Sequence, residues 1–541
     1  MTSENPFKGR SLTAAADWSV DEQRYLYEQT RQLKTAWMKC KDPGDGAVVE
    51  LQKFRIDDPD LNIYLMFLEA STRTKESFRA AANFHNVKLN IFDASTSSFA
   101  KKESILDTIK MLVGYSRRAV FIMRTKTEGV CLAMQEQLAD WATRIGREPP
   151  VFLNAGDGRH EHPTQEYLDE FTFLEQRQWD DSQIHVALIG DLLHGRTVHS
   201  KADGLKVFRK VIVDLVAPPE LAMPDTYKMR MIENGYEVRE YHSIQEYLDS
   251  GKICDCWYFT RLQLERMGDE IRDRENDLRQ AVTFQQPWLT KLLPNTKFYH
   301  PLPRHRERPV IPTFLDTLPL NGWDEQAING FFTRTTELAL VAGQLGGDFK
   351  GETKKRPPSP MEEDDEPSFI TDIAVTRKTH VEDRFKVGIK PVDNGTVIDH
   401  IAKGYELDFI WDRITKIRKV LKLNVRGSHG VFHTNDPSKF KGIMSLPDIL
   451  EVSKTELKKL AAVSPGCTLN IISNASVKAK YRLQMPPRIY DFKELSCKNP
   501  NCITSKDFHQ GIPPYFNRTG NNTFTCKYCG KRHNYIEIWD L

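Results

Sequence analysis

One short polar turn between a predicted strand and a predicted helix most constrains how this chain can fold. Ile63 to Phe67 is an apolar, aromatic run that predicts a buried strand. Residues 75–82 are rich in helix formers. Between them lies Ser71-Thr72-Arg73-Thr74, where helix N-terminal N–H groups, hydroxyls and a guanidinium can surround a phosphate. A capped helix with a surface arginine is the alternative, and these four residues alone favour neither interpretation.

Length and composition limit the class of protein. A chain of 541 residues suggests three or four domains. Hydrophobic residues make up 40% and charged residues 28%, as in soluble globular proteins. The net charge of +2 provides no overall basic field for nucleic acid. No apolar run approaches the ~20 residues of a membrane span, and the start has no signal-peptide pattern. We therefore expect a cytoplasmic protein with reduced cysteines.

Four more predicted strands are each followed by polar residues that could bind a ligand. The strands cover residues 119–123, 151–154, 184–189 and 256–260. In an open α/β sheet, ligands bind in the crevice beyond the carboxyl ends of the strands. A later turn carries two carbonyl groups that could accept from an amine or amide, and a last helix is expected from Gly330. The side chains after the strands are Arg124, His162, Gln165, Arg196, Arg261 and Gln263, and the turn residues are Pro301 and Leu302.

Four cysteines near the end of the chain form the clearest chemical signal. Cys497-x4-Cys502 and Cys526-x2-Cys529 are two close pairs that suit tetrahedral Zn²⁺. Disulfides are the alternative, which a cytoplasmic location disfavours. No acid, base or open ligand position is evident, so the sequence predicts a structural zinc site, one per chain. Nearby lysines leave a zinc-ribbon nucleic-acid binder as a further alternative.

The motifs together resemble a known enzyme family. Ser71–Thr74, His162–Gln165, Arg261–Arg266 and His300–Pro303 follow one another as in the aspartate carbamoyltransferase catalytic chain, over residues 61–346. Residues 386–541, with Gly395–His400 and the four cysteines, resemble the regulatory chain of that enzyme. The resemblance implies two doubly wound parallel-sheet domains, then an α+β nucleotide-binding domain and a small zinc-ribbon-like domain. The implied boundaries are 1–163 with return helices at about 325–346, 164–324, a linker at 347–385, 386–490 and 491–541.

The resemblance implies transfer of a carbamoyl group from carbamoyl phosphate to L-aspartate, a step of pyrimidine biosynthesis. A loop from a neighbouring subunit would complete each site in a catalytic trimer or a multiple of it. Lys101 best matches the loop lysine by spacing, Lys102 stays possible, and Ser97 and Ser98 are equally ambiguous. The implied catalytic residues are Arg73, Thr74, Lys101, Lys102, Arg124 and His162. The implied substrate-binding residues are Ser71, Thr72, Ser97, Ser98, Gln165, Arg196, Arg261, Gln263, Pro301 and Leu302.

The regulatory region is more equivocal. The resemblance implies a site for ATP or CTP at Asp399, His400, Asn470 and Lys480. A basic residue expected in the Lys441–Ser445 stretch is missing, and Ser445 takes its place. A structural region that binds no nucleotide is therefore an alternative. For the whole chain, ornithine carbamoyltransferase and a non-catalytic assembly protein are the rivals. Against the first, residues 300–303 read His-Pro-Leu-Pro where His-Cys-Leu-Pro would be expected.

Overall fold

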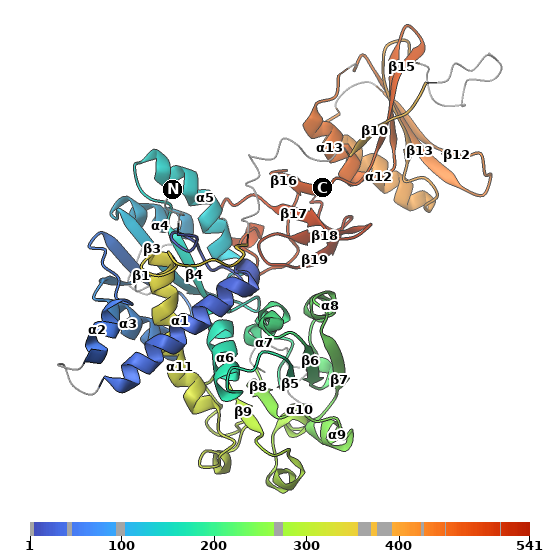
Figure 1. The fold of residues 1–541 in the computed structure, drawn as a ribbon. Coiled ribbons are helices and arrows are strands. Elements are labelled where there is room, and N and C mark those ends of the chain that lie inside the picture. The colour runs from blue at the N-terminus through green and yellow to red at the C-terminus, as the bar shows by residue number, and fades with distance from the viewer. Residues whose placement is uncertain are drawn as a thin grey trace. The chain divides into compact units, whose positions relative to one another are not determined.

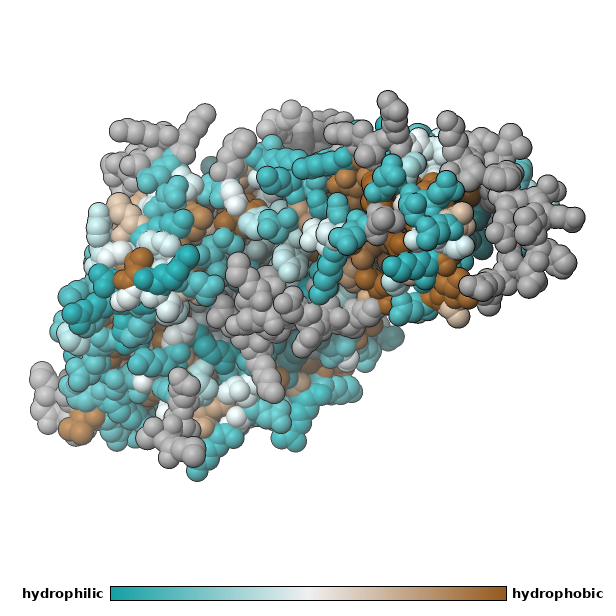
Figure 2. Space-filling view, turned by 90° about the horizontal axis from the view of Figure 1, so that it is seen from above, coloured by the Kyte–Doolittle hydropathy of each residue, from teal (hydrophilic) through white to brown (hydrophobic). Residues whose placement is uncertain are grey.

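The computed structural model describes residues 5–40, 46–92, 103–263, 274–354, 369–375, 392–423, 427–449, 451–508 and 510–540 (Figure 1). It divides into two compact units, Met1–Arg356 and Pro357–Leu541, which are described separately. No helix in these described ranges is long and apolar enough to cross a membrane. The face seen in Figure 2 is mainly hydrophilic, with hydrophobic residues in scattered groups.

A parallel sheet of four strands forms the first half of unit Met1–Arg356. Its order is β2-β1-β3-β4, so the chain adds β2 on one side of β1 and then crosses to place β3 and β4 on the other side. Ser19 caps the first long helix through a capping box with Glu22. The strands are β1 (Leu61–Phe67), β2 (Lys88–Phe92), β3 (Arg118–Thr125) and β4 (Val151–Asp157). The helices are α1 (Val20–Lys39), α2 (Gly46–Gln52), α3 (Arg73–His85), α4 (Ile105–Gly114) and α5 (Val130–Arg144).

A second parallel sheet of five strands follows in the same unit, in the order β7-β6-β5-β8-β9. Its central strands are mostly apolar because both faces of a parallel sheet are covered, and His185 and Asp214 are the charged or polar exceptions in β5 and β6. The strands are β5 (Ile184–Ile189), β6 (Val211–Val216), β7 (Glu237–Tyr241), β8 (Cys256–Phe259) and β9 (Lys297–Tyr299). The helices are α6 (Pro163–Gln176), α7 (Arg196–Gly204), α8 (Asp225–Glu233), α9 (Ile244–Asp249) and α10 (Glu275–Val282). Short 3₁₀ turns occur at Ala15–Asp17, Leu205–Val207, Pro219–Leu221, Gln286–Lys291 and Thr313–Leu315.

Helices α6 and α11 (Trp323–Ala342) connect the two sheets, and Figure 1 shows α6 between them. The prediction that the last helix starts at Gly330 is wrong, because α11 begins at Trp323. Gly330 instead lies inside α11, where a Cβ would come within 2.9 Å of Arg334 Nη1 and 3.3 Å of Leu168 Cδ2. At Gly330 the helices α11 and α6 therefore pack closely against each other. A single glycine in the sequence could not show this contact.

Unit Pro357–Leu541 contains two antiparallel sheets. The larger has the strand order β10-β15-β14-β11-β13-β12 and carries helices α12 (Leu407–Val420) and α13 (Lys454–Val463). Its strands are β10 (Ile370–Asp372), β11 (Gly395–Ile401), β12 (Ser428–His433), β13 (Phe440–Pro447), β14 (Thr468–Ser473) and β15 (Ser476–Leu483). The smaller sheet consists of β16 (Arg488–Tyr490), β17 (Tyr515–Arg518), β18 (Thr523–Cys526) and β19 (Arg532–Asn534), with a 3₁₀ turn at Lys506–Phe508.

Candidate active site

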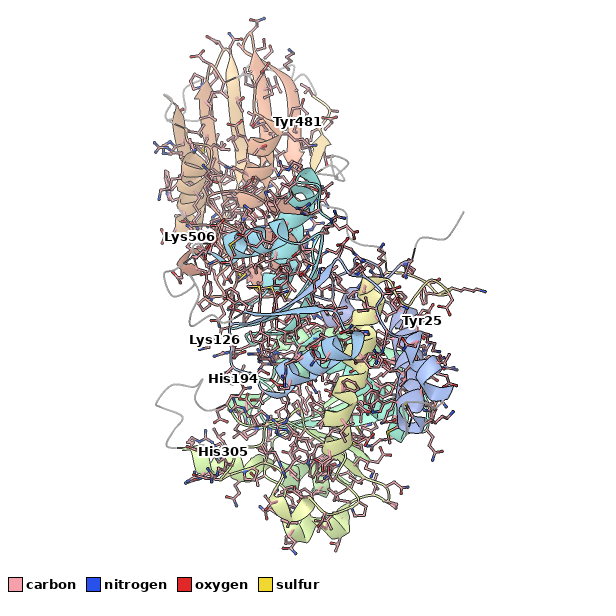
Figure 3. The ribbon with its side chains drawn as sticks, turned by 90° about the vertical axis from the view of Figure 1, so that its left-hand side faces the viewer. Tyr25, Lys126, His194, His305, Tyr481 and Lys506 are labelled. Atoms are coloured by element: carbon pink, nitrogen blue, oxygen red, sulfur yellow. The ribbon has the colours of Figure 1, made fainter. Side chains whose placement is uncertain are left out.

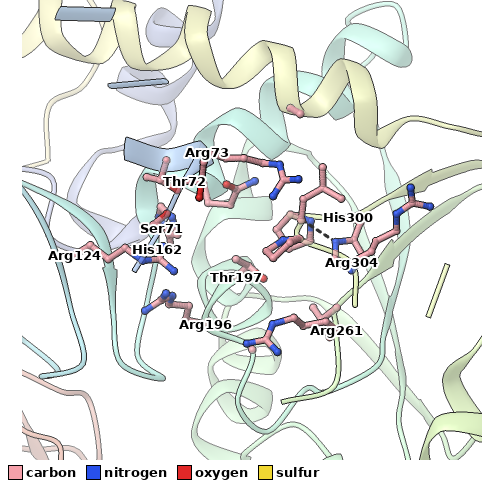
Figure 4. Close-up of a pocket in the computed structure, with 18 of the residues that line it drawn as sticks. Ser71, Thr72, Arg73, Arg124, His162, Arg196, Thr197, Arg261, His300 and Arg304 are labelled. Carbon is pink, nitrogen blue, oxygen red and sulfur yellow. Dashed lines mark hydrogen bonds between the residues drawn. The ribbon is translucent and has the colours of Figure 1, made fainter. Parts of the chain in front are cut away.

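The carboxyl ends of strands from both parallel sheets border one cavity of about 730 Å³. Two of its lining residues, His194 and His305, are labelled in Figure 3. In Figure 4, Arg124 and His162 lie on one side of the pocket, and Arg261 and Arg304 lie on the other. Twelve of the predicted site residues line this cavity, namely Ser71, Thr72, Arg73, Thr74, Arg124, His162, Gln165, Arg196, Arg261, Gln263, Pro301 and Leu302. The other four, Ser97, Ser98, Lys101 and Lys102, lie outside the described residues.

The lining is strongly basic. Glu69 is the one acidic residue among the described residues that border the cavity. Guanidinium groups bind phosphate and carboxylate in two-pronged contacts, so this pocket suits a ligand with several negative charges. The six arginines are Arg73, Arg124, Arg196, Arg261, Arg304 and Arg334.

Ser71–Thr74 spans the junction of β1 and α3, as the sequence predicted, with Arg73 and Thr74 as the first two residues of the helix. Thr72 precedes the helix, and its side chain makes no capping hydrogen bond. The backbone N–H groups of the first helical turn therefore remain available to an anion. Thr74 is buried, whereas Arg73 extends into the cavity, where burial lowers its pKa and nearby Arg304 lowers it further. A bound anion between these two arginines would relieve their mutual repulsion.

His162 precedes α6, which begins with Pro163, a favoured first helical residue. Burial lowers the pKa of His162 well below its usual value, and Arg124 and Arg196 lower it further. The ring is therefore neutral near pH 7. Its Nδ1 lies 3.3 Å from Thr164 Oγ1 and can accept the hydroxyl hydrogen. That arrangement leaves the proton on Nε2, which makes His162 a hydrogen-bond donor.

Glu69 joins two of the arginines and was not identified from the sequence. Its Oε2 accepts from Arg196 Nη1 at 2.9 Å and lies 3.5 Å from Arg124 Nε. The backbone of β4 makes room for this group, because a Cβ on Gly156 would lie 2.8 Å from the Arg196 guanidinium. The Glu69 carboxylate thus fixes the directions of two cations that face the cavity.

The loop after β8 brings Arg261 and Gln263 to the cavity, as predicted. Asp191 and His194 are buried and hold this loop, and the sequence did not predict that role. Asp191 Oδ2 accepts from the Gln263 backbone N–H at 3.0 Å, and Gln263 Nε2 donates to the His194 carbonyl at 3.1 Å. Asp191 directly follows Gly190 at the end of β5, and that position was the available signal.

The segment His300–Pro303 forms the remaining wall and contains a cis peptide bond at Leu302-Pro303. His300 is buried, and its Nδ1 accepts from the Leu302 backbone N–H at 2.7 Å. Burial lowers the pKa of His300 to about 3, with Arg304 and Arg73 adding to the effect. This neutral ring fixes the backbone that presents the Pro301 and Leu302 carbonyl groups.

In unit Pro357–Leu541, the predicted nucleotide residues lie on adjacent strands. Asn470 on β14 is paired with Lys480 on β15, and Asp399 on β11 is paired with Thr468 on β14. Ser445 is buried on β13 and offers no charge there. Lys441 instead lies beside the site, with its Nζ 2.7 Å from Asp399 Oδ1. The 441–445 stretch therefore does supply a basic group, and it is paired with a predicted ligand-binding carboxylate.

The four cysteine sulfur atoms Cys497, Cys502, Cys526 and Cys529 converge in the same unit, and all four residues are buried. The Cys497–Cys529 and Cys502–Cys526 sulfur separations are 3.6 and 3.8 Å. A tetrahedral zinc with Zn–S distances of ~2.3 Å would separate its sulfurs by about 3.8 Å. Geometry and donor chemistry thus fit a structural metal. His533, which the sequence analysis did not identify, places Nε2 3.3 Å from Cys497 Sγ.

Comparisons with known proteins agree with this arrangement. Residues 10–175 match the family model of the aspartate/ornithine carbamoyltransferase carbamoyl-P binding domain. Residues 387–484 and 487–539 match the allosteric and metal-binding domains of the aspartate carbamoyltransferase regulatory chain. The chain resembles crystal structures of Trypanosoma cruzi aspartate transcarbamoylase. In the complex with N-(phosphonacetyl)-L-aspartic acid, the TM-score is 0.52 at 27% identity, covering 62% of this chain and 97% of that one. In the complex with carbamoyl phosphate and aspartate, the TM-score is 0.52 at 26% identity, covering 63% and 99%.

Two relatives match the chain over nearly its whole sequence, and a third matches its first part. The chain is 51% identical over 540 residues to protein PyrBI of Thermotoga maritima, which covers 99% of each chain. It is 48% identical over 542 residues to protein PyrBI of Treponema denticola, again with 99% of each chain covered. The aspartate carbamoyltransferase catalytic subunit of Phocaeicola vulgatus is 31% identical over 354 residues, covering 64% of this chain and 100% of that one. The chain therefore belongs to the PyrBI family, in which an aspartate carbamoyltransferase catalytic region is fused to a regulatory chain with allosteric and metal-binding domains.

Proposed function

We propose that the cavity of unit Met1–Arg356 transfers the carbamoyl group of carbamoyl phosphate to L-aspartate, an enzymatic step of pyrimidine biosynthesis. The observation that carries this proposal is the meeting of six arginines, a neutral buried His162 and a helix N-terminus around one space. Carbamoyl phosphate brings a phosphate group, and aspartate brings two carboxylates. A pocket whose described lining has one acid against six arginines matches that charge.

The phosphate group binds at the start of α3, where Ser71, Thr72, Arg73 and Thr74 surround it. The carbonyl oxygen accepts hydrogen bonds from His162 Nε2, Arg124 and Thr74, which stabilise the negative charge that develops there. Gln165 and the Pro301 and Leu302 carbonyls take the amide N–H groups. Arg196, Arg261 and Gln263 hold the two aspartate carboxylates.

The chemistry needs no covalent enzyme intermediate, because carbamoyl phosphate is already activated. The aspartate amine attacks in its neutral form and forms the new C–N bond. The C–O bond to phosphate then breaks, and the departing phosphate accepts the proton that the amine loses. The protein supplies orientation and electrostatic stabilisation.

An assay with L-aspartate and with L-ornithine distinguishes this proposal from ornithine carbamoyltransferase activity, its nearest rival. We expect carbamoylation of L-aspartate and none of L-ornithine, because Arg261 and Gln263 provide contacts for a second carboxylate. Arg261→Ala should lower the efficiency with aspartate by about 2–5 kcal/mol of transition-state stabilisation while the KM for carbamoyl phosphate stays near normal. Arg308→Ala, which removes a surface ion pair with Glu275, is the matched control. Normal aspartate kinetics in Arg261→Ala would refute the assignment.

A trimer with shared sites is the proposed assembly, in which the 97–102 loop enters a neighbouring subunit. Inactive Arg73→Ala and Lys101→Ala chains should regain activity when they are mixed, because some sites then contain neither lesion. Recovery with Lys102→Ala in place of Lys101→Ala would assign the role to Lys102. No recovery with either loop variant after verified subunit exchange would favour a site built from one chain.

For the regulatory region, we propose weak binding of ATP or CTP at Asp399, His400, Asn470 and Lys480. Support comes from the allosteric-domain match and from the placement of these residues on adjacent strands. Lys441 already forms an ion pair with Asp399. A nucleotide that contacts Asp399 therefore adds only a modest binding free energy. Aspartate saturation curves with ATP or CTP test this, and a large effect abolished by Lys480→Ala would show a stronger site. The metal is proposed to be Zn²⁺, whose thiolate ligands require a reducing compartment such as the cytoplasm.

A further inference from the structure

Asp169 is a fully buried carboxylate one turn after Gln165 on α6. Its Oδ1 accepts from Gln165 Nε2 at 2.8 Å and from Gln326 Nε2 at 2.7 Å. Gln165 is the residue expected to accept from the carbamoyl amide. Gln326 lies on α11 and also lines the cavity. One oxygen atom therefore holds two glutamine side chains from two different helices.

The second oxygen of Asp169 is bound just as closely. Oδ2 accepts from the Tyr258 hydroxyl at 2.7 Å and from Lys201 Nζ at 3.1 Å. Lys201 also contacts Glu166 and Glu170, and all four charged side chains are fully buried. Burial raises the pKa of Glu166 and of Glu170, and the Lys201 ammonium opposes that effect. All four of these contacts come from donors, namely two glutamine amides, the Tyr258 hydroxyl and the Lys201 ammonium, so Asp169 acts here only as a hydrogen-bond acceptor.

An acceptor-only partner determines which way each glutamine amide points. Gln165 must turn its nitrogen toward Asp169, so its oxygen is left for the cavity. Gln326 likewise turns its nitrogen to Asp169, and its Oε1 accepts from the His300 backbone N–H at 2.9 Å. His300 Nδ1 in turn accepts from the Leu302 N–H. Asp169 is thus connected to both sets of acceptors, the Gln165 oxygen and the Pro301 and Leu302 carbonyl groups.

We propose that Asp169 is a positioning residue that selects a carbamoyl group over an acetyl group by fixing both sets of amide acceptors. This inference rests on the proposed function. A carbamoyl group has an NH₂ with two hydrogens to donate, whereas an acetyl group has a methyl in its place. A site whose acceptors are fixed rejects a ligand without donors, because its buried oxygens are then left unpaired.

Acetyl phosphate tests this inference on the full chain, because it keeps the phosphate and carbonyl groups and lacks the amine. The efficiency kcat/KM with carbamoyl phosphate and the inhibition constant of acetyl phosphate are measured for wild type and Asp169→Asn. We expect the efficiency to fall about tenfold or more, since an amide at position 169 can also donate and no longer orients Gln165. The inhibition constant of acetyl phosphate should change by less than about threefold, because that ligand does not use the acceptors.

Two further variants keep the test decisive. Tyr258→Phe removes a donor to Oδ2 and leaves both glutamine contacts at Oδ1, so it should preserve the discrimination between the two ligands. Gln326→Met breaks the connection from Asp169 to His300, leaves the Tyr258 and Lys201 contacts at Asp169 Oδ2 in place, and should reduce the discrimination. It replaces Asp169→Asn as the test if circular dichroism shows that the latter does not fold.

The outcomes separate the inference from the function on which it rests. A wild-type chain that makes no carbamoyl aspartate contradicts the proposed function itself. An active wild type, with variants that weaken the response to both ligands by the same factor, overturns the positioning role and leaves Asp169 as a residue needed only for stability. In a chain that carries both Asp169→Asn and Gln326→Met, a loss of kcat/KM no larger than that of Asp169→Asn alone supports a single connected path.

Discussion

Glu69 Oε2 lies 2.9 Å from Arg196 Nη1, although the two residues are 127 positions apart in the sequence. Glu69 follows β1 of the first parallel sheet, and Arg196 opens α7 after β5 of the second. This ion pair is mostly buried, with 13% and 11% of the two side chains exposed. It therefore connects the phosphate end of the proposed active site with its aspartate end.

Glu69→Gln should lower kcat/KM for aspartate about tenfold to a hundredfold, because a hydrogen bond between charged groups contributes about 1.5–3 kcal/mol. The variant keeps the shape of the side chain and removes the charge that orients Arg196. Aspartate saturation curves at fixed carbamoyl phosphate measure the effect. Glu76→Gln is the matched control, since its ion pair with Arg79 is half-exposed on α3 and contributes little. Wild-type kinetics in Glu69→Gln would show that Arg196 is held without it.

Acid should destabilise the catalytic unit in part through His85. Its ring is buried between the Ile56 N–H and the Thr335 carbonyl, and burial lowers its pKa to about 4. Below about pH 6.5 the unfolded chain binds a proton that the folded chain does not bind until pH nears 4, so stability is lost as the pH falls through this window. Between pH 6.5 and 5 the loss amounts to about 2 kcal/mol.

Urea unfolding of wild type and His85→Gln at pH 7.5 and pH 5 isolates this contribution. The free energy of unfolding of the wild type, relative to that of His85→Gln, should fall by about 2 kcal/mol between pH 7.5 and pH 5. The exposed His242, replaced in the same way, should give no such change. An advantage that is constant across the two pH values would mean that the folded chain protonates His85 as readily as the unfolded chain.

Loss of the metal should unfold the small sheet and spare catalysis. The metal-binding region has about 50 residues, too few for a core to hold it without a metal or crosslink. Cys502→Ser should lose bound zinc and become sensitive to protease, whereas Cys467→Ser, at a buried cysteine outside the cluster, should keep it. Zinc content by atomic emission and the rate of carbamoyl transfer give the two readings. Full zinc retention in Cys502→Ser would contradict the four-cysteine site.

Local signals made part of this structure predictable from the sequence. The strand, polar turn and helix around Ser71–Thr74 occupy adjacent residues. Two cysteine pairs with short spacing are enough to predict a metal site. Apolar runs predicted the individual buried strands, and the resemblance to the carbamoyltransferase family implied that they form two parallel sheets. Twelve predicted site residues lie at one cavity because each lies at or beyond the carboxyl end of a strand and these strand ends meet there.

The supporting residues could not be predicted, because long-range packing gives them their roles. Glu69, Asp191 and Asp169 act on side chains or backbone groups far away in the sequence, and no spacing rule connects them. Lys441 was not assigned to the site because Ser445 takes the place of the expected basic residue in the sequence, whereas the β11–β13 pairing brings Lys441 to Asp399. The start of α11 was misjudged because Gly330 was taken for a helix boundary instead of a packing contact.

The most direct test of the account is the product formed from carbamoyl phosphate and L-aspartate, identified by mass spectrometry for wild type, His162→Ala and the surface variant His242→Ala. The account predicts N-carbamoyl-L-aspartate from wild type and His242→Ala at similar rates. His162→Ala should form it about a hundredfold more slowly or worse, because a fixed donor to the carbonyl oxygen is lost. No carbamoyl aspartate from the wild type, or an undiminished rate in His162→Ala, would contradict the central claim.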